Sequence, residues 1–62
     1  MSWSDDVAVE RLQARLPRAT ISTHRRRTGK PCRVTVRLMG HTSHYDSTTI
    51  ADASLQAIEA YR

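Results

Sequence analysis

The clearest hydrophobic pattern in the chain is a strict alternation of apolar and polar residues over Cys32–Leu38. The apolar members of this alternation are Cys32, Val34, Val36 and Leu38. A period of two residues is typical of an antiparallel strand that buries one face and exposes the other. We therefore expect a strand here, with Arg33, Thr35 and Arg37 on its solvent face.

Weaker patterns on both sides of this segment predict two further strands. Several β-branched residues favour a strand over residues 19–26. Residues 41–47 also alternate, and Tyr45 is their expected packing residue. Glycine and proline punctuate the intervals, which predicts a turn over residues 27–31 and a tight hairpin turn at Met39–Gly40.

A first helix is expected over residues 5–15. Ser4 precedes it and can accept a hydrogen bond from a free backbone N–H of the first turn. Its apolar stripe consists of Val9, Leu12 and Leu16. Pro17 disfavours helical backbone at the residue before it, so the helix is expected to end there.

A second helix is expected over residues 50–61, with Thr48 or Thr49 as its N-cap. The residues expected to form its buried face are Ala51, Leu55 and Ile58, with Ile50, Ala53 and Ala57 beside them. The many alanines would allow the helix to approach a sheet closely.

These elements predict one α+β domain over residues 1–62, in the order α-β-β-β-α, with a three-stranded antiparallel meander and both helices on one face. Residues 29–61, with their hairpin, Gly40 and alanine-rich final helix, resemble the double-stranded-RNA-binding domain. That family uses a basic cluster at the start of its second helix, whereas residues 47–52 contain no Lys or Arg. The resemblance therefore implies a fold and assigns no RNA-contacting residue.

A second resemblance rests on Ser22-Thr23-His24 followed by three arginines. This segment is similar to the HicA-type messenger-RNA interferase toxins, which carry a catalytic histidine on an early strand before a basic hairpin. Position 21 is Ile, where that family has Gly. The resemblance implies RNA cleavage with His24 as the base, and an RNA-cleaving toxin is the third functional alternative below.

The charge of the chain is concentrated in its middle. The 62 residues carry a formal net charge of +4, and nine of the ten basic residues lie between Arg11 and Arg37. No Asp or Glu occurs between Glu10 and Asp46. Such an asymmetry favours an anionic partner. The candidate nucleic-acid-binding residues are the basic residues of the central hairpin: Arg25, Arg26, Arg27, Lys30, Arg33 and Arg37.

Three functions are compatible with these features. The first is a nonenzymatic module that contacts the phosphates of DNA or RNA through the arginine-rich hairpin. The second is a phage- or prophage-like accessory protein that binds an acidic surface of a host protein and modulates it. The third is the HicA-like toxin. A homodimer is also expected, because a thin core and a three-stranded sheet leave two strand edges to pair.

Other classes of function are not expected from this sequence. The lone Cys32 and three scattered histidines do not make a disulfide framework or a zinc signature. We expect no metal, cofactor or catalytic residues. No apolar run is long enough to span a membrane, and the polar, acidic start of the chain is unlike a signal peptide. The sequence therefore predicts a cytoplasmic protein without a membrane partner.

Overall fold

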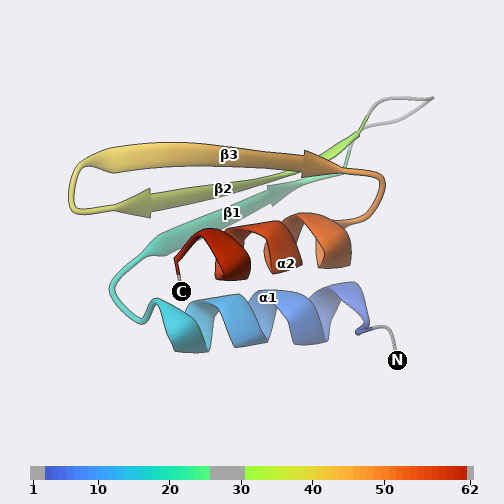
Figure 1. Ribbon diagram of the computed structural model, residues 1–62, viewed down its shortest axis with the longest axis horizontal. Helices are drawn as coiled ribbons and strands as arrows, with labels where there is room; N and C mark the ends of the chain where they lie inside the picture. Colours follow the sequence, from blue (N-terminus) through green and yellow to red (C-terminus); the bar gives the residue numbers. More distant parts are fainter. Residues whose placement is uncertain (1–2, 26–30, 62) are drawn as a thin grey trace.

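The computed structural model describes residues 3–25 and 31–61 (Figure 1). Its elements are α1 (Asp5–Arg15), β1 (Thr20–His24), β2 (Cys32–Leu38), β3 (His41–Ser47) and α2 (Ile50–Ala60). The predicted α+β class and the α-β-β-β-α order are confirmed.

The three strands form an antiparallel sheet in which β2 is central and β1 and β3 are the edges. β1 is shorter than the predicted strand over residues 19–26. Ala19 precedes β1 and is buried in the core, and Arg25 follows its last residue. The turn between β2 and β3 has positive φ at both central residues, 51° at Met39 and 81° at Gly40. This combination defines a type I′ turn, whose twist matches that of the two strands.

Both helices begin with the caps that the sequence predicts. The Ser4 hydroxyl accepts a hydrogen bond from the backbone N–H of Val7, and the Thr49 hydroxyl accepts one from that of Asp52. Thr49, rather than Thr48, is therefore the cap of α2. α1 ends at Arg15, two residues before Pro17, as expected from the restriction that proline places on its predecessor.

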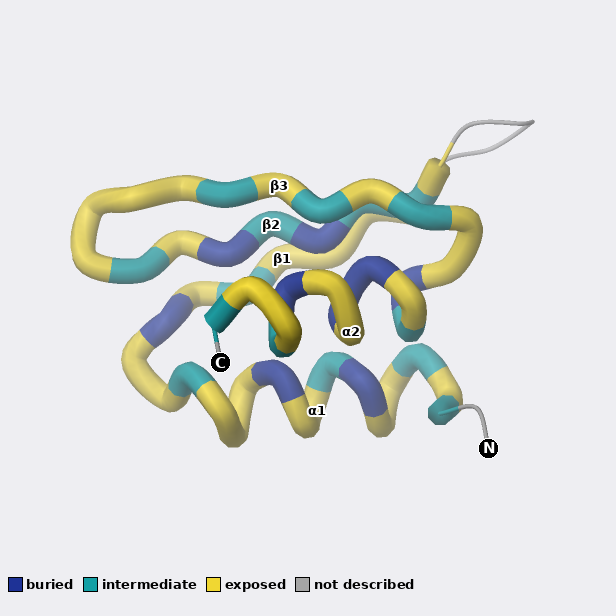
Figure 2. Tube along the Cα trace, in the orientation of Figure 1, coloured by how far each residue is buried: buried dark blue, intermediate teal, exposed yellow. Residues whose placement is uncertain are grey.

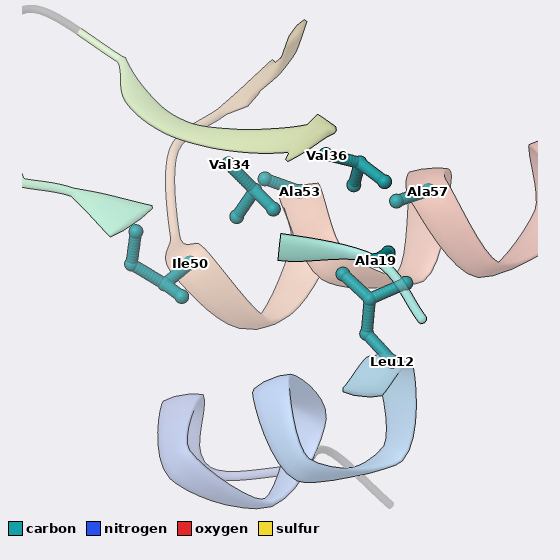
Figure 3. Close-up of a cluster of buried hydrophobic side chains, with 7 residues drawn as sticks. All are labelled: Leu12, Ala19, Val34, Val36, Ile50, Ala53 and Ala57. Carbon is teal, nitrogen blue, oxygen red and sulfur yellow. The ribbon is translucent and has the colours of Figure 1, made fainter. Parts of the chain in front are cut away.

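The helices lie on the same side of the sheet but do not cover it equally. α2 packs on β2 and β3, and α1 packs chiefly on α2, so that α2 lies between α1 and the sheet (Figures 1 and 2). α1 nevertheless reaches the common core through Leu12, which is fully buried. Figure 3 shows this core, which consists of Leu12, Ala19, Val34, Val36, Ile50, Ala53 and Ala57.

The predicted buried face of α2 is wrong in part. The buried residues are Ile50, Ala53, Ser54 and Ala57, whereas Leu55 is 39% exposed. The observed set follows helical spacing and consists mostly of small side chains. A stripe of small residues lets the helix axis approach β2 and β3 closely, so the larger Leu55 is turned away from the sheet. Ala51 and Ile58 are half-buried.

Among the described residues, no helix is long and apolar enough to cross a membrane.

Candidate nucleic-acid interface

The face of the sheet that turns away from the helices is polar at every position. Opposite residues of an antiparallel pair point to the same side, so the strand register identifies this face. We call it the open face, and its residues are Thr20, Ser22 and His24 from β1, Arg33, Thr35 and Arg37 from β2, and Thr42, His44 and Asp46 from β3. A sheet face without an apolar residue has nothing to bury against another layer, so it is free to meet solvent or a polar ligand.

The central strand supplies both arginines of the open face. Arg33 donates two hydrogen bonds to Asp46 of β3, from Nε to Oδ1 at 2.8 Å and from Nη2 to Oδ2 at 3.2 Å. This hydrogen bonding and the negative charge of Asp46 raise the pKa of Arg33. The two hydrogen bonds hold the guanidinium of Arg33 in one orientation. Arg37 lies four residues further along β2, is exposed, and has no ion pair within residues 3–25 and 31–61.

A second polar pair lies beside this ion pair. The Thr35 hydroxyl on β2 and the His44 Nδ1 on β3 are 3.0 Å apart, which is hydrogen-bond distance. The two residues are direct neighbours in the register of β2 and β3. Either group can be the donor, depending on the protonation of the imidazole ring.

These side chains surround a shallow hollow of about 230 Å³. All three strands and the first residue after β1 contribute to it, through His24, Arg25, Arg33, Thr35 and His44. The described surface thus brings two guanidinium groups, two imidazoles and a hydroxyl together around one depression. Arginine N–H groups, imidazole N–H groups and hydroxyls are all donors to phosphate oxygens.

Arg25 is placed differently from the other predicted site residues. Its guanidinium forms an ion pair with Asp5 at the start of α1, and its side chain is 70% exposed. The other Asp5 oxygen, Oδ1, accepts a hydrogen bond at 3.0 Å from the backbone N–H of Ala51 in α2. Arg25 therefore joins the rim of the hollow to the helical layer.

Three of the six predicted site residues lie at the hollow or on the open face of the sheet. Arg25 and Arg33 line the hollow together, and Arg37 lies on the same open face as Arg33. The other three, Arg26, Arg27 and Lys30, lie outside the described residues.

The hollow also contains Thr35 and His44, which are not among the six predicted site residues, and His24, which only the resemblance to the toxins singled out. Alternation alone places His44 and His41 on opposite faces of β3, which the register confirms. It does not show that His44 lies beside Thr35 or shares a hollow with His24, because those relations depend on how β2 pairs with each neighbour. Within the described part of the chain, no group of three or more His, Cys, Asp or Glu residues is placed to hold a metal ion.

Comparison of the chain with models of known protein families, with curated protein sequences and with solved structures gives no match.

Proposed function

We propose that this protein is a nonenzymatic module that binds nucleic acid through its backbone phosphates. The observation that carries the proposal is the composition of the open face. That face combines Arg33, Arg37, His24 and His44 with neutral hydroxyl residues. The single carboxylate of the open face, Asp46, accepts hydrogen bonds from Arg33 and so orients a cation.

The sequence between β1 and β2 supplies further positive charge. Arg26 and Arg27 follow directly on Arg25, which lines the hollow, and Lys30 lies two residues before β2. Several positive charges close together in one hairpin favour contacts to successive phosphates, which provide affinity that falls steeply with salt.

The open face is suited to phosphates rather than to bases. Proteins that read single-stranded bases on a sheet stack them on aromatic side chains. The open face has no aromatic ring other than its two imidazoles, and Tyr45 lies on the opposite side of the sheet, paired with Val34. We therefore expect DNA and RNA of different sequences to bind with similar affinity.

The proposal is tested by measuring the affinity for labelled duplex DNA and duplex RNA over a series of salt concentrations. The key variant is Arg37→Gln, which removes one exposed cation from the open face. Its affinity should fall about equally for all sequences, and the salt dependence should lose roughly one phosphate contact. Arg15→Gln is the matched control, because it removes the same charge from the exposed surface of α1.

A second variant tests the hairpin without disturbing the ion pair of Arg25 with Asp5. Replacement of Arg26, Arg27 and Lys30 by Gln should weaken binding more than Arg37→Gln, because three charges are lost together. Unchanged binding by both variants would show that this surface is not the site. If the parent protein binds neither DNA nor RNA at low salt, the proposal is wrong and an acidic protein surface becomes the leading partner.

A further inference from the structure

The hydrogen bond between Thr35 and His44 gives the hollow a property that arginines alone do not have. When His44 is neutral, its Nδ1 can accept the proton of the Thr35 hydroxyl. When both ring nitrogens carry protons, Nδ1 can only donate, and the Thr35 oxygen must accept. The Thr35 hydroxyl proton is then released from His44 and becomes available to another acceptor.

The surroundings of Thr35 indicate what that acceptor is. Thr35 lines the hollow together with Arg33, which keeps N–H groups beyond the two that Asp46 accepts. His24 of β1, the direct neighbour of Arg33 in the strand register, lines the same hollow. An oxyanion lying between these groups would accept from a guanidinium, a hydroxyl and imidazole N–H groups, which is the donor set that a phosphate requires.

The charged and titratable groups around His44 come from all three strands and from the residue after β1. Arg33 and Arg37 of β2 lie diagonally beside His44. Asp46 lies two residues along β3 and forms an ion pair with Arg33. His24 and Arg25 line the same hollow. A bound anion adds negative charge directly at the hollow and thus favours the protonated ring.

From this geometry we infer that the hollow is a binding subsite for one phosphodiester group, and that binding there is coupled to proton uptake by His44 through the Thr35 hydroxyl. In the bound state, His44 Nδ1–H donates to Thr35 Oγ1, and the Thr35 hydroxyl donates to a phosphate oxygen. The proton comes from solvent, and no covalent bond forms or breaks. This inference rests on the proposed function, which supplies its ligand, a phosphodiester of nucleic acid. It adds where on the sheet one phosphate is bound and that this contact depends on a proton.

The test uses oligothymidylate, whose phosphodiesters and bases keep their charge between about pH 5 and 8, the range in which histidine changes charge. At constant salt, the parent protein should bind more tightly at about pH 5.5 than at about pH 8. His44→Gln should remove most of this difference. His41→Gln is the control, because His41 is an exposed histidine of the same strand that faces the other side of the sheet.

A second pair of variants tests the hydroxyl. Thr35→Val keeps the shape and strand preference of the side chain and should lower the affinity at the acidic pH about tenfold, the effect of one hydrogen bond to a charged group. Thr23→Val makes the same chemical change at an exposed position of β1 that faces the other side of the sheet, and should bind as the parent does.

A titration with dimethyl phosphate separates this inference from the proposed function. Followed by NMR, this single phosphodiester should shift the resonances of Thr35 and of the His44 ring, whether or not a polymer binds elsewhere. If oligothymidylate binds but Thr35→Val, His44→Gln and the parent behave alike, the subsite is wrong and the proposed function stands. If dimethyl phosphate shifts these resonances but no nucleic acid binds, the subsite stands and the proposed function is wrong.

Discussion

Ser54 is fully buried in α2, and its hydroxyl has no hydrogen-bond partner among the described residues. A buried hydroxyl without a partner loses its hydrogen bonds to water and gains none in return. We expect Ser54→Ala to raise the free energy of unfolding by about 1 kcal/mol, with a small further gain from the helix propensity of alanine. Urea denaturation measures this change.

The reverse substitution nearby provides the control. Ala57 is also fully buried in α2, and Ala57→Ser should lower the free energy of unfolding by a similar amount, about 1 kcal/mol. A Ser54→Ala protein that is less stable than the parent would show that the hydroxyl makes a favourable contact.

Met39 occupies a backbone conformation that favours other residues. Its φ is 51°, and its side chain contributes little to packing because the residue is 90% exposed. Asparagine tolerates positive φ and is preferred before glycine in type I′ turns. Met39→Asn should therefore raise the free energy of unfolding by up to about 1 kcal/mol, and with it the midpoint of thermal unfolding. Met39→Val should lower it, and an equal midpoint for both variants would contradict this reading of the turn.

The titration of Tyr45 makes the stability of the protein depend on pH in the alkaline range. Burial, followed by the proximity of Tyr61, raises the pKa of Tyr45. The unfolded chain then loses this proton first, near the ordinary tyrosine value of about 10. The contribution of Tyr45 to stability is therefore complete below about pH 10 and is lost as the pH rises through the higher native pKa.

Tyr45→Phe should make the stability of the protein less sensitive to alkali. Urea denaturation at about pH 8 and at about pH 11 should show a smaller loss of stability for the variant than for the parent. Tyrosinate absorbance, followed in the folded parent, gives the native titration directly. The prediction is refuted if the tyrosinate absorbance of the folded protein rises over the same pH range as that of the unfolded chain.

At the scale of elements, Asp5 connects the start of α1 with two other segments. One carboxylate oxygen accepts from the backbone N–H of Ala51 in the first turn of α2, and the other pairs with Arg25 after β1. The negative charge thus lies near the N-terminal ends of both helices, where the helix dipoles favour it. The ion pair between Asp5 and Arg25 therefore connects α1, which packs chiefly on α2, with the end of β1.

We expect Asp5→Ala to lower the free energy of unfolding by about 1–2 kcal/mol, mostly through the charge-assisted hydrogen bond to Ala51, since the exposed ion pair with Arg25 contributes little. Asp6→Ala is the control, because the exposed Asp6 also lies in the first turn of α1. It should cost only a few tenths of a kcal/mol. Equal losses in denaturant unfolding would mean that the contact to α2 is not what stabilises the fold.

At the scale of the whole molecule, the sheet leaves two edges, because β1 and β3 each pair only with β2 within the described residues. β1 is the less protected edge, since residues 20–24 contain no acidic residue, lysine, arginine or proline. Natural sheets use such residues to prevent pairing between edges. A chain of this size also buries a smaller fraction of its unfolded surface than a larger domain does, which favours association.

We therefore expect the protein to form a homodimer through β1. Sedimentation velocity at high micromolar concentration should give a particle of twice the 7.0 kDa chain mass. Thr23→Lys places a charge on this exposed edge and should shift the equilibrium towards the monomer. The prediction is wrong if the parent sediments as a monomer at that concentration.

Much of the fold could be predicted from local signals. The alternation over Cys32–Leu38 identifies the central strand, Ser4 and Pro17 mark the limits of α1, and Gly40 marks the hairpin turn. Each of these signals acts within a few residues of itself, so a linear reading detects it. The buried face of α2 could not be identified in this way, because apolar residues occupy two adjacent arcs of that helix.

The sequence by itself determined the order of the elements, which face of the central strand is polar, and the concentration of positive charge around it, since all three depend on residues close together in the chain. The tertiary structure alone decided that Ala53 and Ala57, not Leu55, face the sheet, because only small side chains allow α2 to approach it closely. It also decided the partners within the candidate site. Asp5 and Arg25 are 20 residues apart, and Thr35 and His44 are nine apart, so only the packing of α1 and the register of β2 with β3 bring their side chains into contact.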